Sequence, residues 1–152
     1  MIQYKQGIEF IDYVRSFHHL LSQYYSKLKN NSQKEKVKMI LDYLVEHESK
    51  MESTLLEFED NISSKVGKFW FSFIENNKLP ECFKQPEMHT EMTIDEVLEK
   101  AIRFDECLIA LYKHLSDYAS IPEVKSFFES MADMESHEMR NVIRNIQRID
   151  DM

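Results

Sequence analysis

The sequence predicts an all-α protein, a four-helix bundle built from two copies of one antiparallel helical hairpin. Three observations predict it. The chain has only two glycines and three prolines among 152 residues, which are too few turn formers for an all-β or α/β fold. Capping signals, together with apolar residues in steps of three and four, mark four long helices. The second half of the sequence also matches the first half without a gap.

The composition fits a single globular domain that spans residues 1–152. Apolar residues make up 43% and charged residues 30%, as in soluble globular proteins. The net charge is −8 with scattered basic residues, which argues against nucleic-acid binding, because phosphates need a basic stripe. The chain has no apolar run long enough for a membrane span and no apolar stretch near its start. We therefore expect a cytoplasmic protein that does not bind membranes.

Capping boxes place the starts of the helices. In this motif a side-chain oxygen accepts a hydrogen bond from a free backbone amide, and a Glu three residues later reaches back. Three such patterns occur: Ser32-x-x-Glu35, Thr93-x-x-Glu96 and Ser120-x-x-Glu123. We expect helices near residues 5–30, 33–62, 94–118 and 121–149. The short gaps after residues 30 and 118 predict two tight antiparallel hairpins, 5–62 and 93–150.

The two predicted hairpins are copies of each other at an offset of 87 residues. Identical residues align along both helices and across the turn: Phe17 with Phe104, Leu21 with Leu108, Tyr25 with Tyr112, Leu28 with Leu115, Val37 with Val124, and Glu48 with Glu135. Agreement over a helix, a turn and a second helix indicates a repeated unit. We expect the two hairpins to bury one shared core, because neither can bury its apolar face alone.

The crossover between the hairpins, residues 63–92, is too long for a tight turn. A helix of roughly 30 residues is about 45 Å long, so a chain that returns to the same end of the bundle needs such a connection. Five apolar residues of the crossover follow helical spacing: Val66, Phe69, Trp70, Phe73 and Ile74. This spacing favours a short helix over the bundle edge, with a lid or a dimer contact as the alternative. The rest of the crossover, residues 76–93, is predicted as loop.

Each long helix should carry an apolar seam, and ionisable residues interrupt the seams at one level. The interruptions are His18, Glu48, Asp105, Glu135 and Glu138. The repeat aligns position 18 with 105, 48 with 135 and 51 with 138, so we expect these side chains to face one another in one layer of the core. Several carboxylates and one imidazole cannot all stay ionised in a dry core. A divalent metal would neutralise them, since both groups are good ligands for iron, manganese and zinc.

The pattern resembles the rubrerythrin-type branch of the ferritin-like superfamily over nearly the whole chain. The stretches that carry the resemblance are residues 24–28, 37–38, 43–48 and 131–135. The resemblance implies a ferritin-like bundle with a metal centre in its core. That family holds two iron ions with a Glu from one helix of each hairpin and Glu-x-x-His from the other. By this resemblance Glu48 and Glu135 match the Glu of Glu-x-x-His, and His18 and Asp105 stand at the positions of the single Glu.

The chain departs from the family pattern at two ligand positions. Met51 and Glu138 stand where the two histidines would be. The resemblance therefore implies a remodelled centre that binds one iron, manganese or zinc ion, and redox handling of oxygen or peroxide if the protein is an enzyme. The rival interpretation is a metal-free bundle that acts as an interaction or structural module, for which a homodimer through the aromatic patch around Trp70 is expected. A small-molecule binder with a carboxylate-lined pocket is a third interpretation.

The remaining histidines and both cysteines are interpreted as structural. Five histidines lie off the seams or lack carboxylates at ligand spacing: His19, His47, His89, His114 and His137. Of these, His47 and His137 are expected to be half-exposed at the surface. Cys82 and Cys107 form no disulfide framework, which favours a reducing compartment. Cys107 is expected to be a small buried thiol, with a soft metal ligand as the alternative.

Overall fold

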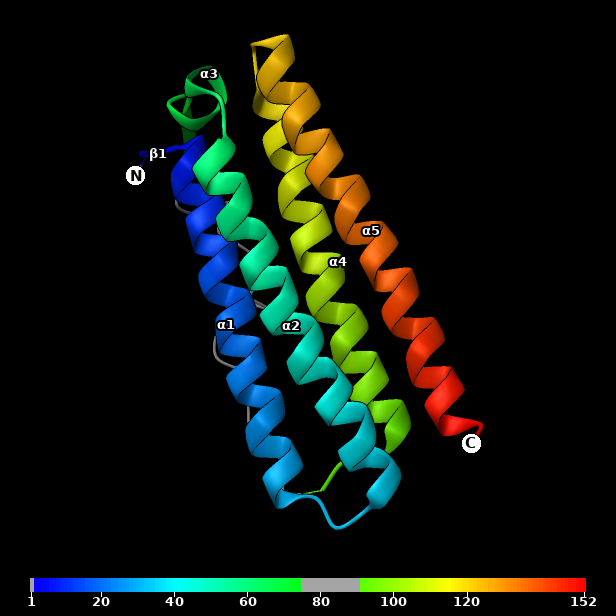
Figure 1. Cartoon of the computed structure of the whole chain (residues 1–152). Helices are drawn as coiled ribbons and strands as arrows, with labels where there is room; N and C mark the ends of the chain where they lie inside the picture. Colours follow the sequence, from blue (N-terminus) through cyan, green and yellow to red (C-terminus); the bar gives the residue numbers. More distant parts are fainter. Residues whose placement is uncertain (1, 75–90) are drawn as a thin grey trace.

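The computed structural model describes residues 2–74 and 91–152, and it has the predicted all-α architecture (Figure 1). Its four long helices are α1 (Gly7–Asn31), α2 (Glu35–Asn61), α4 (Ile94–Tyr118) and α5 (Pro122–Asp150). Helices α1 and α2 form one antiparallel hairpin, and α4 and α5 form the other. The predicted helix bounds agree with these to within two residues.

The start of α4 lies beside the turn that joins α1 to α2. Glu91, shortly before α4, accepts hydrogen bonds from the backbone N–H of Gln33 at 2.7 Å and from the hydroxyl of Ser32 at 3.4 Å. Helix α2 ends at the opposite end of the bundle, where α5 begins (Figure 1). The end of α2 and the start of α4 therefore lie at opposite ends of the bundle, and the long connection that joins them confirms the predicted crossover. The predicted loop at 76–93 falls mostly on residues outside the described ranges.

A two-stranded antiparallel ribbon, which the sequence did not predict, joins the N-terminus to the crossover. Strand β1 (Ile2–Gln6) pairs with β2 (Trp70–Ile74), and Gln6 lies opposite Trp70. Before β2, helix α3 (Ser64–Gly67) makes a single short turn. The predicted short helix through residues 66–74 is therefore wrong after Gly67, where α3 ends, because residues 70–74 form a strand.

Around Phe71, the side chains of β2 alternate between the surface and the core, as strand geometry requires. Phe71 is buried and packs edge-on against Phe10 of α1 and Phe128 of α5, with ring centroids 5.6 and 5.5 Å away. Its neighbours Trp70 and Ser72 are exposed. The ribbon therefore closes the end of the bundle with one aromatic side chain and leaves Trp70 outside.

Gly7 lies where the ribbon passes into α1, at a close approach between two backbone segments. Its N–H donates to the carbonyl of Phe69 at 2.9 Å. A Cβ at position 7 would lie 2.2 Å from the carbonyl oxygen of Val66. Glycine is needed at this position because no side chain fits between the two segments.

Only one of the three predicted capping boxes forms. Thr93 accepts from the backbone N–H of Glu96, and the carboxylate of Glu96 accepts from the backbone N–H of Thr93, both at 3.1 Å. The other two, at residues 32–35 and 120–123, were predicted wrongly, because α2 and α5 begin without a side-chain cap. The serine at 32 instead holds the start of α4 through Glu91.

The core lies between the two hairpins and contains most of the predicted seam residues together with residues beside the seams, such as Phe17, Ile40 and Phe104. Repeat-equivalent residues meet there: the rings of Phe17 and Phe104 pack edge-on at 5.9 Å. Leu21 and Leu108 are fully buried nearby. Among the helices that the structure describes, none combines the length and the apolar character that a membrane span requires.

Candidate metal centre in the bundle core

Four of the five predicted site residues lie buried inside the bundle. Their exposed fractions are between 1% and 4%, and each comes from a different long helix: His18 from α1, Glu48 from α2, Asp105 from α4 and Glu135 from α5. The seams above and below them are apolar. These four side chains are called the polar layer below.

His18 bridges the two hairpins within the polar layer. Its Nδ1 contacts the carboxylate of Glu48, and its Nε2 lies 3.2 Å from Oε1 of Glu135. Burial opposes a charge on the ring, but the two carboxylates outweigh burial and raise the pKa of His18 well above its ordinary value. His18 is therefore an imidazolium that donates one N–H to each glutamate.

Asp105 completes the layer from α4. Burial, followed by the negative charges of Glu48 and Glu135, raises the pKa of the Asp105 carboxyl well above its ordinary value, and the charge on His18 offsets only part of this. Burial and the neighbouring carboxylates therefore favour the neutral form of Asp105. A proton on each of His18 and Asp105 would offset part of the negative charge of the buried acids.

Two repeat-equivalent tyrosines border the polar layer. The hydroxyls of Tyr25 and Tyr112 are buried, and within the described residues neither has a hydrogen-bond partner. Burial raises the pKa of both; the charges of Glu48 and Asp105 add to the effect at Tyr25, and the charge of Glu135 adds at Tyr112. Both phenols are therefore within electrostatic reach of the layer, and each leaves a buried donor unmatched, which is costly.

Glu138, the fifth predicted residue, lies at the edge of the layer rather than within it. It is 26% exposed, and its Oε2 lies 3.9 Å from Nδ1 of His47 on α2. His47 is only 8% exposed, so its expected half-exposed position is wrong. The apolar face of α2 is wide enough to bury His47 as well as Glu48. The spacing of seven between Ile40, which is also buried, and His47 is the sequence signal that could have revealed this.

The other predicted positions fall outside the layer. Met51, at the first histidine position of the resembled family, is buried. His19 is exposed and pairs with Glu52 on α2 at 3.1 Å. His114 and His137 are exposed, as predicted for His137, whereas His89 lies outside the described residues.

Cys107, two residues after Asp105, is half-buried and disulfide-bonded. The prediction of a buried thiol is therefore wrong, and no thiolate is offered to a metal from this position. Cys82 lies outside the described residues. Disulfides are uncommon in reducing compartments, so the cytoplasmic location stays a prediction.

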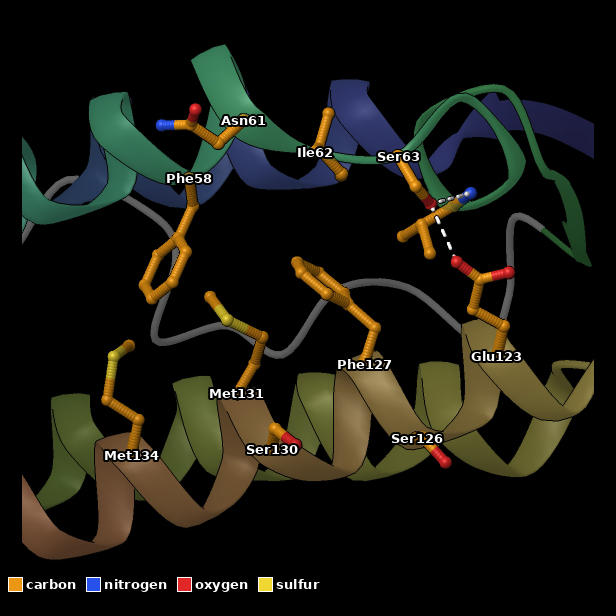
Figure 2. Close-up of a pocket in the computed structure, with 11 residues that line it drawn as sticks. Phe58, Asn61, Ile62, Ser63, Glu123, Ser126, Phe127, Ser130, Met131 and Met134 are labelled. Atoms are coloured by element: carbon orange, nitrogen blue, oxygen red, sulfur yellow. Dashed lines mark hydrogen bonds between the residues drawn. The ribbon is translucent and has the colours of Figure 1, made fainter.

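A separate pocket of about 420 Å³ opens between the end of α2 and the beginning of α5. Figure 2 shows that Phe58 reaches into it from one side and Phe127, Met131 and Met134 from the other. The hydroxyl of Ser63 donates to Glu123 at 3.0 Å and closes one end. No residue of the polar layer lines this pocket, so it is not the carboxylate-lined pocket of the small-molecule interpretation.

Within residues 2–74 and 91–152, no three His, Cys, Asp or Glu side chains already surround a common point as metal ligands do. The reason is the position of His18, whose two ring nitrogens are both directed at carboxylates. A metal in the polar layer would require one of these contacts to open. The chain matches no protein-family model, no curated protein and no solved structure.

Proposed function

We propose that the polar layer binds one divalent transition-metal ion, and that the chain is a ferritin-like bundle of the rubrerythrin type with a remodelled centre. The observation that carries this proposal is the burial of one imidazole and three carboxylates, from four different helices, in a core that is otherwise apolar. Imidazole and carboxylate are the donor set of iron, manganese and zinc sites. Helical bundles build such sites from side chains on facing helices.

The charge balance of the layer supports one divalent ion. With His18 and Asp105 protonated, one cation faces two carboxylates, for a formal charge of +1 − 2 = −1. A divalent ion held by a neutral His18 and three carboxylates gives +2 − 3 = −1. The ion would therefore replace two protons without changing the net charge of the core. Metal binding would then not add to the free-energy cost of burying charge.

The unmatched phenols fit the same proposal. The hydroxyls of Tyr25 and Tyr112 have no hydrogen-bond partner among the described residues, and they would be available as donors to a group bound in the layer. Bound iron or manganese would supply redox chemistry toward oxygen or peroxide. His18, Glu48 and Glu135 would hold the ion, and Asp105 would complete the set from α4.

The test is the metal content of the protein purified without chelator, measured as metal per chain by mass spectrometry. We expect one iron, manganese or zinc ion per chain, and its loss in the double variant Glu48→Gln/Glu135→Gln. The matched control is Glu46→Gln/Asp133→Asn, which removes two exposed, repeat-equivalent acids on the same helices and should keep the metal. A metal-free wild type whose melting temperature does not respond to added iron, manganese or zinc would refute the proposal.

A metal-free bundle that acts as a structural or interaction module is the second candidate. The specific observation in its favour is that His18 already forms hydrogen bonds with the carboxylates of Glu48 and Glu135, so these two side chains have a partner without a metal. Trp70 and Tyr4 are exposed on the ribbon and would be the contact of a homodimer. Under this candidate the protein is dimeric by light scattering, and Trp70→Ser makes it monomeric without affecting the layer.

A further inference from the structure

Helices α2 and α5 carry a second pair of facing polar side chains just outside the polar layer, His47 and Glu138. The carboxylate of Glu138 is partly exposed, whereas His47 is nearly buried, and 3.9 Å separates Oε2 of Glu138 from Nδ1 of His47. The ring of His47 stacks on Tyr43 with centroids 6.1 Å apart, and Asn145 donates to the Tyr43 hydroxyl at 3.0 Å. The pair is therefore held in place and reaches from the surface into the interior.

This outer pair is connected to the layer along both helices. His47 directly precedes Glu48 in α2, and Glu138 lies one helical turn after Glu135 in α5. Among the five predicted acids and bases, Glu138 is the only one that is not buried.

The seam between α2 and α5 joins the two hairpins. The packing within each hairpin is closer than the packing of α2 against α5. The pocket of Figure 2 hollows the same seam, and Met134 in its wall lies one turn before Glu138. An ion that enters between α2 and α5 has less packed protein to displace than one that enters between the two helices of a hairpin.

We propose that His47 and Glu138 form the entrance through which a divalent cation reaches the polar layer. This inference rests on the proposed metal binding. A hydrated cation loses water reluctantly, and an exposed carboxylate beside an imidazole lets it exchange water for protein ligands in steps. The negative charge of Glu138 also raises the local cation concentration, an effect that increases association rates by about 10- to 1,000-fold at charged clefts.

The experiment measures the rate of Co²⁺ uptake by the metal-free full-length protein, followed by visible absorption in a stopped-flow instrument. The variant is His47→Ala/Glu138→Gln. The matched control, His19→Ala/Glu52→Gln, removes the same residue types, with the same charge, from the pair between α1 and α2. In this control pair, His19 directly follows the layer residue His18, and Glu52 lies one helical turn after the layer residue Glu48.

We expect the entrance variant to take up Co²⁺ at least about tenfold more slowly than wild type and to reach the same final amount per chain, while the control keeps the wild-type rate. An unchanged rate in the entrance variant would overturn the inference. A lower final amount would also overturn it, because Glu138 or His47 would then be a ligand of the bound ion. If wild type takes up no Co²⁺, the proposed metal binding itself fails.

Discussion

Replacing Glu135 by leucine should destabilise the metal-free protein strongly. Glu135 is 1% exposed, and its removal deletes the acceptor that lies 3.2 Å from Nε2 of His18. His18 is left buried with Glu48 as its only contacting carboxylate. Loss of one partner from a buried ion pair costs about 3–5 kcal/mol. In a domain of this size that corresponds to a fall in melting temperature of about 6–20 °C, at about 2–4 °C per kcal/mol.

The informative comparison is with a variant in which the whole layer is apolar, His18→Leu/Glu48→Leu/Asp105→Leu/Glu135→Leu. Replacing a complete buried ionic group with apolar residues of similar size is often neutral or stabilising by about 1–4 kcal/mol. We therefore expect the fourfold variant to be at least as stable as wild type, although it contains the same Glu135 change. The assay is urea unfolding of both variants with a chelator present, followed by far-ultraviolet circular dichroism.

Two results would refute this reasoning. If Glu135→Leu lies within about 1 kcal/mol of wild type, which is typical of ordinary substitutions, the layer is not a coupled ionic group. If the fourfold variant is less stable than Glu135→Leu, the layer is needed for folding rather than kept for a function. Asp133→Asn, an exposed change two residues away, controls for a general effect of altered charge on α5.

Three further predictions concern pH, backbone packing and proton release. The pKa values of Asp105 and His18 are raised in the folded protein from ordinary values of 3.8 and 6.5, so the stability that they contribute is present below those values and is lost as pH rises. The urea midpoint of the metal-free protein should therefore fall as pH rises, from about pH 3.8 for the contribution of Asp105 and from about pH 6.5 for that of His18. Asp105→Asn should remove the fall that begins at the lower of these two values. Gly7→Ala should lower the melting temperature much more than Gly67→Ala. A Cβ at position 7 would lie 2.2 Å from the carbonyl oxygen of Val66, whereas a Cβ at position 67 would meet only side chains, the nearest being that of Ile62 at 3.3 Å. Metal uptake at neutral pH should release about two protons per ion, measured with a pH indicator in weakly buffered solution.

The helices could be predicted because their signals are local. Apolar residues at steps of three and four fix which face of each helix is buried, and the offset of 87 residues fixes which positions correspond. The burial of His18, Glu48, Asp105 and Glu135 follows from both signals together. The burial of these four residues could be predicted without knowing the angles at which the helices cross.

The ribbon could not be predicted in the same way because its two strands lie far apart in the sequence. In residues 69–74 the aromatic residues fit a helical period, and the alternation around Phe71 is too short to exclude it. The pairing with residues 2–6 decides the outcome, since a strand needs a partner for its backbone hydrogen bonds. Pairing at such a separation leaves no local mark on either segment.

The outer pair was missed for a different reason. A seam that counts two buried positions in every seven residues assigns the neighbouring positions to the surface. Helix α2 buries a wider stripe, which includes Ile40 and His47. Glu138 was placed inward by its equivalence to Met51. The structure separates these two positions: Met51 is buried, whereas Glu138 faces His47 at the edge.

The differences between the two hairpins bear directly on what the layer can hold. Glu48 and Glu135 are identical in the two copies, and they meet the two ring nitrogens of His18 from opposite hairpins. The equivalent of His18 is Asp105, so the layer has one imidazole and not two. A second imidazole there would add a base with no carboxylate left to face it. An aspartate instead adds an oxygen donor, and burial raises the pKa of that carboxyl, so that a bound cation would compete with a proton for it. Two equivalent ions would require two equivalent half-sites, so an asymmetric set of this kind supports the proposal of one ion rather than two.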